Sequence, residues 1–325
     1  MLICRPLVLN MLSALNCSLG FTDVAYRKLV GRVFGKTPDQ VVNLHTATIR
    51  NLAALLLDSG PADRLVASGS RLDLGIRTEE GLKFNPDPSV IKLIDAMRFA
   101  LSQPVNLGSA SLLNCFSHQA LLFAAYTQAY LAENGYDRSK IQDPIDFEFF
   151  YPLEEVVTSR GFELPIGPLD TYTVGLTPID VNYEVVNNPL SGCPNMLSAH
   201  GWAVPLDVMR TIKYEFPHAN VLASQRHFVG GRPKDTIAAF SLGRFFGTQG
   251  HADYDPHALG IVFKRAQQEH RKSMRSGAPD IPVEIMYDDA RSAKARQSAL
   301  TQAQIRQIFG LPDPLASQRM RELIK

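Results

Sequence analysis

The segment from Asn106 to Leu131 is the most apolar long stretch of the chain, and it restricts the fold more than any other feature. Leucine, phenylalanine and tyrosine side chains recur throughout it. A segment of this kind has to be buried inside the protein. We therefore predict that it forms a central buried helix or a pair of helices.

The composition is that of a folded globular protein. Of the 325 residues, 45% are hydrophobic and 20% are charged, which excludes an intrinsically disordered chain. No run of 18 apolar residues occurs, so a membrane-spanning helix is not expected. Arg5-Pro6, Asn10 and Asn16 interrupt the apolar run that a signal peptide would need. We expect a soluble intracellular protein with one large domain or two modest ones.

Helical signals dominate on both sides of a differently composed middle segment. Helices are predicted over residues 7–15, 22–33, 39–57, 88–101, 205–215, 218–228, 234–246, 256–275, 288–298, 301–309 and 313–324. Residues 136–190 are instead acidic and rich in proline and aromatic residues, and short strands or extended arms are expected at Tyr172–Val174 and Val181–Val185. The sequence thus predicts a mainly α fold of two helical lobes with this acidic segment inserted between them.

The predicted domain boundaries follow these changes in composition. They give an N-terminal assembly arm over residues 1–20, an N-terminal helical lobe over 21–135, an acidic insert rich in proline and aromatic residues over 136–203, and a C-terminal helical lobe over 204–325. Residues 136–190 contain three basic and ten acidic residues, so this segment carries −7 and the rest of the chain +8. A basic remainder is compatible with a polyanionic partner.

Five short segments occur in the order in which a known family has them. They are Arg32–Gly35 leading into Pro38–Leu44, then Ser89–Asp95, Asn106–Leu121, Gly230–Phe240 and Ile308–Asp313. Together they resemble the nucleocapsid proteins of phleboviruses and tenuiviruses, a helical family with distant relatives among the flexuous plant-virus coat proteins. The chain departs from this family in its acidic insert and in the few basic residues near the first crossing between lobes.

The resemblance implies a viral coat protein that polymerises on single-stranded RNA without sequence specificity. It implies a place in the virion and the host cytoplasm, and neither enzymatic activity, cofactor nor metal. A coat of this kind needs a positive groove for phosphates. The candidate RNA-binding residues are Arg71, Arg77, Lys83, Arg226, Arg232, Lys234 and Arg244. The apolar segment Met1–Leu19 is expected to exchange between subunits and so to build a ring or filament.

One turn gives the most specific of these predictions. Gly230-Gly231 precedes Arg232 and Lys234, and a helix is expected to begin near Asp235. Glycines allow a backbone to approach a phosphate closely, and helix N-termini attract anions. We therefore predict a phosphate site at this turn.

A cysteine enzyme is the alternative to a coat protein. Cys193 with His200 resembles the Ser-Gly-Cys turn of glutamine-deamidating bacterial toxins, with Asp207 as the residue that orients the histidine. The spacing of seven residues is shorter than in that family. Cys115 with His200 is another pair, but Cys115 lies in the apolar segment, where burial is expected to make it inert. A virion or scaffold protein with protein partners only is a third alternative.

Motifs for metals and nucleotides are weak or absent. The segment His251–His257 contains four potential metal donors, but its Asp-Pro step is typical of a loop at a helix start. The cysteines Cys4, Cys17, Cys115 and Cys193 contain no C-x-x-C pair and are expected to be free buried thiols. Neither G-x-x-x-x-G-K-[ST] nor a strand-anchored G-x-G-x-x-G occurs, so nucleotide-driven motors and dinucleotide enzymes are not expected.

Overall fold

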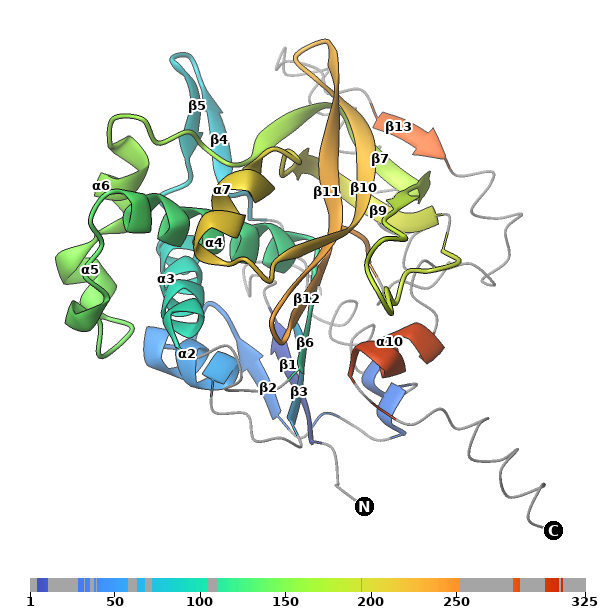
Figure 1. Cartoon of the computed structure of the whole chain (residues 1–325), viewed down its shortest axis with the longest axis horizontal. Coiled ribbons are helices and arrows are strands. Elements are labelled where there is room, and N and C mark those ends of the chain that lie inside the picture. Colours follow the sequence, from blue (N-terminus) through green and yellow to red (C-terminus); the bar gives the residue numbers. More distant parts are fainter. Residues whose placement is uncertain are drawn as a thin grey trace.

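The structure is a computed structural model of the chain (Figure 1). It describes residues 5–10, 29–31, 33–35, 38, 40–57, 63–67, 72–103, 110–193, 195–251, 283–286, 302–309 and 311. Within these ranges no helix has the length and apolar character needed to cross a membrane.

Strands and helices alternate through the first half of the chain and strands dominate the second. The strands are β1 (Arg5–Asn10), β2 (Gln40–Asn43), β3 (Asp63–Ala67), β4 (Gly75–Thr78), β5 (Gly81–Phe84), β6 (Ala110–Asn114), β7 (Gly167–Pro178), β8 (Asp180–Val181), β9 (Asn195–Ala203), β10 (Asn220–Val229), β11 (Arg232–Leu242), β12 (Phe245–Thr248) and β13 (Val283–Met286). The helices are α2 (Ile49–Leu57), α3 (Pro88–Ser102), α4 (Phe116–Glu133), α5 (Asp146–Phe150), α6 (Leu153–Thr158), α7 (Val208–Glu215) and α10 (Gln302–Ile308), with a 3-10 helix at Arg138–Lys140.

A mixed sheet of eight strands forms the centre of the molecule, in the order β2-β1-β3-β6-β12-β11-β10-β8. The first five of these strands are parallel to one another, and β11, β10 and β8 continue the sheet in antiparallel fashion. Helices α2, α3 and α4 lie on one side of the sheet and α10 on the other (Figure 1). A second sheet, β13-β7-β9, and the small β4–β5 hairpin complete the fold.

Successive residues of the central strands face two different cores. On β3, Leu65 and Ala67 pack in the core beneath α2, α3 and α4, whereas Val66 packs in the second core with Ile305 and Phe309 from the region of α10. This alternation is the period of two that a strand imposes on its side chains. Because both faces of the sheet are covered, the middle residues of β1, β2 and β3 are apolar on both faces.

The predicted mainly α fold of two helical lobes is wrong, because the chain is an α/β protein built on the eight-stranded sheet. The two helices expected over residues 218–228 and 234–246 are strands β10, β11 and β12, and the expected central helix is divided into β6 and α4. A strand buried on both faces is a short apolar run that periodicity alone does not distinguish from a buried helix.

Several predicted elements are confirmed. Helices α3, α7 and α10 match the expected segments 88–101, 205–215 and 301–309, and β7 contains the expected strand Tyr172–Val174. The helices expected over 256–275, 288–298 and 313–324 lie outside the described residues. Residues 5–10 of the predicted assembly arm form β1, which lies between β2 and β3 in the sheet. Self-association through this arm stays a prediction.

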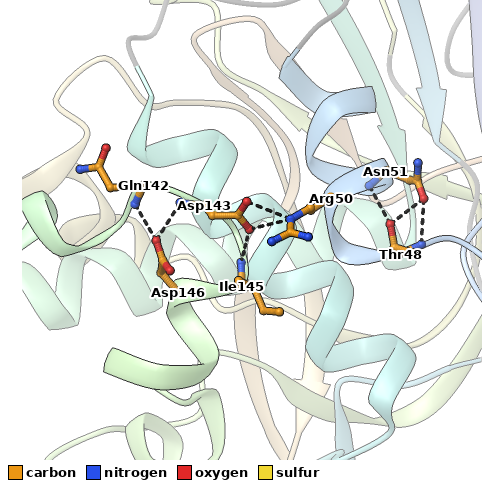
Figure 2. A network of polar contacts seen from close by, with 7 residues as sticks. All are labelled: Thr48, Arg50, Asn51, Gln142, Asp143, Ile145 and Asp146. Carbon is orange, nitrogen blue, oxygen red and sulfur yellow. Dashed lines mark hydrogen bonds and ion pairs between the residues drawn. The ribbon is translucent and has the colours of Figure 1, made fainter.

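The acidic segment is anchored on two of the helices. Figure 2 shows the side chain of Arg50, on α2, donating from Nε to the two carboxylate oxygens of Asp143 at 2.9 and 3.2 Å. Arg98, fully buried on α3, lies with its guanidinium 4.1 Å from the centroid of the Phe147 ring of α5. Two cationic side chains of the helical layer therefore hold residues 143–150 in place.

Candidate active site

Cys115 forms the turn between β6 and α4 and has an unusual backbone conformation, with φ +50° and ψ −110°. Among the non-glycine residues that the structure describes, it shares a positive φ with Asn187 alone. Such a conformation costs on the order of 1–3 kcal/mol and persists only where the surrounding structure enforces it. A sharp turn that presents a nucleophile between a strand and a helix is the arrangement called a nucleophile elbow in hydrolases.

Hydrogen bonds to the neighbouring strands on both sides enforce this turn. The amide of Cys115 donates to the carbonyl of Thr248, at the end of β12, with a length of 2.8 Å. On the other side, the side-chain amide of Asn114 donates to the carbonyl of Ala67 on β3 at 3.3 Å. Within the turn, the hydroxyl of Ser117 donates to the carbonyl of Asn114 at 2.9 Å.

The chain carries Cys115 and His251 to the carboxyl ends of two adjacent parallel strands. β6 leads to Cys115 and β12 leads, three residues beyond its end, to His251. The amide of His251 donates to the carbonyl of Leu197 at 2.8 Å, and the sulfur of Cys115 lies 4.0 Å from the carbonyl oxygen of Ala199. Because residues two apart in a strand are separated by about 6.6 Å, both groups meet the same short stretch of β9.

The N-terminus of a long helix lies beside Cys115. Helix α4 has 18 residues and begins directly after Cys115, so the unpaired N–H groups of its first turn and the positive end of the helix dipole lie at this turn. Acyl transfer through a covalent intermediate requires a nucleophile, a histidine that moves its proton and N–H donors that stabilise the oxyanion. The edge of the sheet at Cys115 is therefore our candidate active site.

Three other histidines near this edge are engaged elsewhere. The ring of His118, on α4, is 3.1 Å from the carbonyl oxygen of Ile237 through Nε2, and burial lowers its pKa to about 3. The Nε2 atoms of His200 and His227 are 3.5 Å apart, and burial, followed by the nearby histidines, lowers the pKa of His200 well below its usual value. His251, three residues beyond the end of β12, is our candidate general base.

The predicted pair of Cys193 and His200 is not brought together. Cys193 precedes β9, where its sulfur accepts a hydrogen bond of 2.7 Å from the side chain of Gln304, and burial raises the pKa of its thiol. His200 lies five residues beyond Asn195, the first residue of β9, which is about 16 Å along an extended strand. Asp207, the residue expected to orient His200, precedes α7.

The expected burial of Cys115 is confirmed, whereas its expected place inside an apolar helix is wrong. Its side chain is only 7% exposed, but it lies at a strained turn at the edge of the sheet and not inside a helix. The polar residues Asn114, Ser117, His118 and Gln119 interrupt the apolar segment around it. This interruption is the signal in the sequence that could have identified the turn.

His251, the candidate partner of Cys115, belongs to a segment that the sequence analysis had weighed for another role. His251 opens the segment His251–His257, which was considered only as a potential metal site, and it is the one residue of that segment among the described residues. Within the described part of the chain, no cluster of three or more His, Cys, Asp or Glu side chains is arranged to hold a metal ion.

Two of the predicted RNA-binding residues lie on the β4–β5 hairpin. Arg77 on β4 is exposed and donates to the carbonyl of Leu169 at 3.4 Å, and exposed Lys83 on β5 forms an ion pair with Glu80. Arg71 falls outside the residues that the structure describes.

Most of the others lie on the β10–β11 hairpin. Arg226, Arg232 and Lys234 are exposed there, and Arg226 forms an ion pair with Asp235 at 2.9 Å. Arg244 lies apart, in the turn before β12, where burial lowers the pKa of its guanidinium to about 10. RNA binding by these seven residues stays a prediction.

The turn at Gly230 and Gly231 already binds a carboxylate. Their amides donate to the two oxygens of Asp170 at 2.7 Å each. Their φ angles of +60° and +73° are those of a type I′ hairpin turn, so the segment beginning at Arg232 is strand β11 and not the expected helix. The helix dipole that was to attract a phosphate is therefore missing from this turn.

Comparisons with known proteins agree with an α/β fold. No family model matches the chain, and no curated protein matches it. Among solved structures, a glutamine amidotransferase from Thermotoga maritima is similar with a TM-score of 0.54 and 11% identity, covering 94% of this chain and 98% of that one. The glutaminase domain of Trypanosoma brucei CTPS with bound acivicin aligns over 82% of this chain and 94% of its own, with 11% identity and a TM-score of 0.46.

These findings overturn the resemblance to viral nucleocapsid proteins and with it the prediction of a coat protein. The expectation that the chain is not an enzyme is contradicted as well, since the solved structure that shares its fold over 94% of this chain is described as a glutamine amidotransferase. The chain shares its fold with the Thermotoga glutamine amidotransferase.

Proposed function

We propose that this protein hydrolyses a carboxamide through a thioester formed on Cys115. The observation that carries the proposal is the backbone of Cys115, held at φ +50° between a parallel strand and an 18-residue helix. Glutamine is the first substrate to test, since the similar structure from Thermotoga is described as a glutamine amidotransferase. The alternative pair, Cys193 and His200, has no support from the geometry, because Cys193 precedes β9 and His200 lies five residues along this extended strand.

The reaction needs two chemical steps. His251 takes the proton of the Cys115 thiol, the resulting thiolate attacks the amide carbon, and the C–N bond of the tetrahedral intermediate breaks as His251 gives that proton to the leaving ammonia. Water, deprotonated by the same histidine, then attacks the thioester, and the C–S bond breaks to release the carboxylic acid and the free thiol. Atoms balance as one amide and one water yielding one acid and one ammonia.

Each step passes through an oxyanion that needs hydrogen-bond donors. The amide of Phe116, the first residue of α4, follows the nucleophile directly, which is the position of one oxyanion donor at a nucleophile elbow. The dipole of α4 adds to its effect, because its positive end lies at the same point. Loss of one such donor typically lowers kcat by about 10²–10³-fold.

A carboxylate is expected to orient His251, as in other triads. Asp253 is the candidate in the sequence, since it follows His251 by two residues, and it lies outside the described part of the chain.

The proposal is tested by measuring ammonia and glutamate release from L-glutamine by the full chain. Cys115→Ala and His251→Asn should each lower the rate by at least about 10³-fold, whereas Cys193→Ala, the matched control at the other described thiol, should retain it. Hydroxylamine added to the wild-type reaction should divert the thioester to the hydroxamate. Full activity of Cys115→Ala, or loss of activity in Cys193→Ala with an intact Cys115, would contradict the assignment.

A further inference from the structure

A chain of buried side-chain amides ends at the sulfur of Cys115. Gln119, on α4, donates from Nε2 to the backbone carbonyl of Trp202 at 2.8 Å and to Oε1 of Gln249 at 3.0 Å. Gln249 in turn places its Nε2 atom 3.6 Å from the sulfur of Cys115. Gln119 is 3% exposed and Gln249 is 1% exposed, so water does not compete for these bonds.

The backbone carbonyl of Trp202 determines the orientation of the side-chain amides of Gln119 and Gln249. A carbonyl oxygen only accepts, so Gln119 has to present its NH₂ group to Trp202. The same NH₂ group lies against Gln249, which therefore has to present its oxygen. The NH₂ group of Gln249 is then left on the side of Cys115, and the sulfur receives a donor and not an acceptor.

The backbone holds this donor in place. Gln249 follows β12 directly, and its amide donates to the carbonyl of Ala238 on β11 at 2.8 Å. The other group near the sulfur is the carbonyl of Ala199, which is 4.0 Å away and only accepts. A thiol can therefore turn its S–H towards Ala199, whereas a thiolate can accept from Gln249.

We infer that Gln249 is a positioning residue that stabilises the thiolate of Cys115 and holds its sulfur at the elbow, with Gln119 fixing the orientation of its amide. This inference rests on the proposed function only in taking Cys115 as the nucleophile. A thiolate accepts hydrogen bonds far better than a thiol, so a fixed N–H donor shifts the balance towards the ionised form. Cys115 would then be prepared for attack before the substrate binds.

The test measures the rate at which iodoacetamide alkylates Cys115 between pH 5 and pH 10, followed on the peptide that contains it. Gln249→Met keeps a similar volume and removes the donor, and the midpoint of its rate profile should move up by about one pH unit, which is about a tenfold slower reaction at pH 7. Gln249→Glu adds a negative charge beside the sulfur and should slow the reaction further. Gln142→Met, at an exposed position, is the matched control and should leave the profile unchanged.

Gln119→Met tests the relay, because it leaves the amide of Gln249 free to turn its oxygen towards the sulfur. Its midpoint should lie between those of the wild type and Gln249→Met. A cooperative thermal transition in each variant separates this effect from unfolding. If Gln249→Met and Gln249→Glu both alkylate with the wild-type profile while folded, the inference is overturned. The amidase assay tests the proposed function separately. If Cys115→Ala is inactive while Gln249→Met alkylates with the wild-type profile, the proposed function stands and only the role of Gln249 is rejected.

Discussion

The amide of Cys115 donates to the carbonyl of Thr248 across 2.8 Å, and this bond joins the two strands that carry the candidate catalytic residues. β6 ends at the thiol, and β12 continues past Thr248 to Gln249 and His251. Backbone pairing alone thus brings a cysteine at residue 115 and a histidine at residue 251 to the same edge of the sheet.

Replacing Cys115 by glycine should stabilise the fold relative to replacing it by alanine. Both changes remove the thiol, but alanine keeps a Cβ atom at φ +50°, whereas glycine adopts this conformation freely. The strain that glycine removes from the folded state is larger than the entropy that it adds to the unfolded state. We therefore expect the free energy of unfolding of Cys115→Gly to be about 1 kcal/mol higher than that of Cys115→Ala. Urea denaturation of the two variants measures the difference. Equal stabilities, or a less stable glycine variant, would show that the turn holds no strain.

Gly250 should tolerate no side chain. A Cβ atom built at this position would lie 2.1 Å from Cγ and 2.6 Å from Sδ of Met196, and 3.0 Å from the carbonyl oxygen of Leu197. That carbonyl accepts the hydrogen bond from the amide of His251, so an added methyl group pushes the histidine away from β9. We expect Gly250→Ala to lower the free energy of unfolding by about 1–3 kcal/mol and to reduce amidase activity.

A double variant and a control sharpen this prediction. Met196→Ala empties the space that the new methyl group needs, so the cost of Gly250→Ala should be smaller in the Met196→Ala background than in the wild type. Gly31→Ala is the control, because a Cβ atom there meets no other atom within 4 Å. Chemical denaturation and glutamine hydrolysis, measured on the wild type, the two single variants, the double variant and the control, give both readouts. A fully active and stable Gly250→Ala would contradict the tight packing of this turn.

The elements that the sequence predicts best are those with local signals. Helix α3 begins as the residues around Pro88 indicate: Asp87 accepts a hydrogen bond of 2.8 Å from the amide of Ser89, and proline occupies the first turn. By contrast, β6 has the sequence Ala-Ser-Leu-Leu-Asn, which contains no β-branched residue and continues into an apolar helix. Its extended form is set by pairing with β3 and β12, and such long-range pairing leaves no local trace.

The same reason explains why the candidate site was missed. Cys115 and His251 are separated by 136 positions, and only the parallel pairing of β6 with β12 makes them neighbours. Cys193 and His200 were paired on the resemblance of the Ser-Gly-Cys turn to that of bacterial deamidases, but the extended strand β9 carries His200 away from Cys193. Correct pairing of the two distant residues required the sheet topology.

The buried histidines should make the protein sensitive to mild acid. Burial lowers the pKa of His118 to about 3 and that of His227 to about 4, and it lowers the pKa of His200 as well. In the unfolded chain each would take up a proton near pH 6.5. Between that pH and about 4 the unfolded state therefore binds more protons than the folded state, and the free energy of unfolding falls as the pH drops.

The size of the loss follows from this difference. At pH 5.5 each neutral, buried histidine lowers the stability by about 1.4 kcal/mol relative to pH 7.5, so the three together should lower it by about 4 kcal/mol. Urea denaturation at these two pH values measures the change, and most carboxylates stay ionised over this range. His118→Gln should remove about a third of the pH dependence, because the glutamine does not titrate, whereas His218→Gln, at an exposed position, should leave it unchanged. Equal stability of the wild type at both pH values would mean that these histidines are protonated in the folded protein, which would also return His118 and His200 to the candidates for the general base.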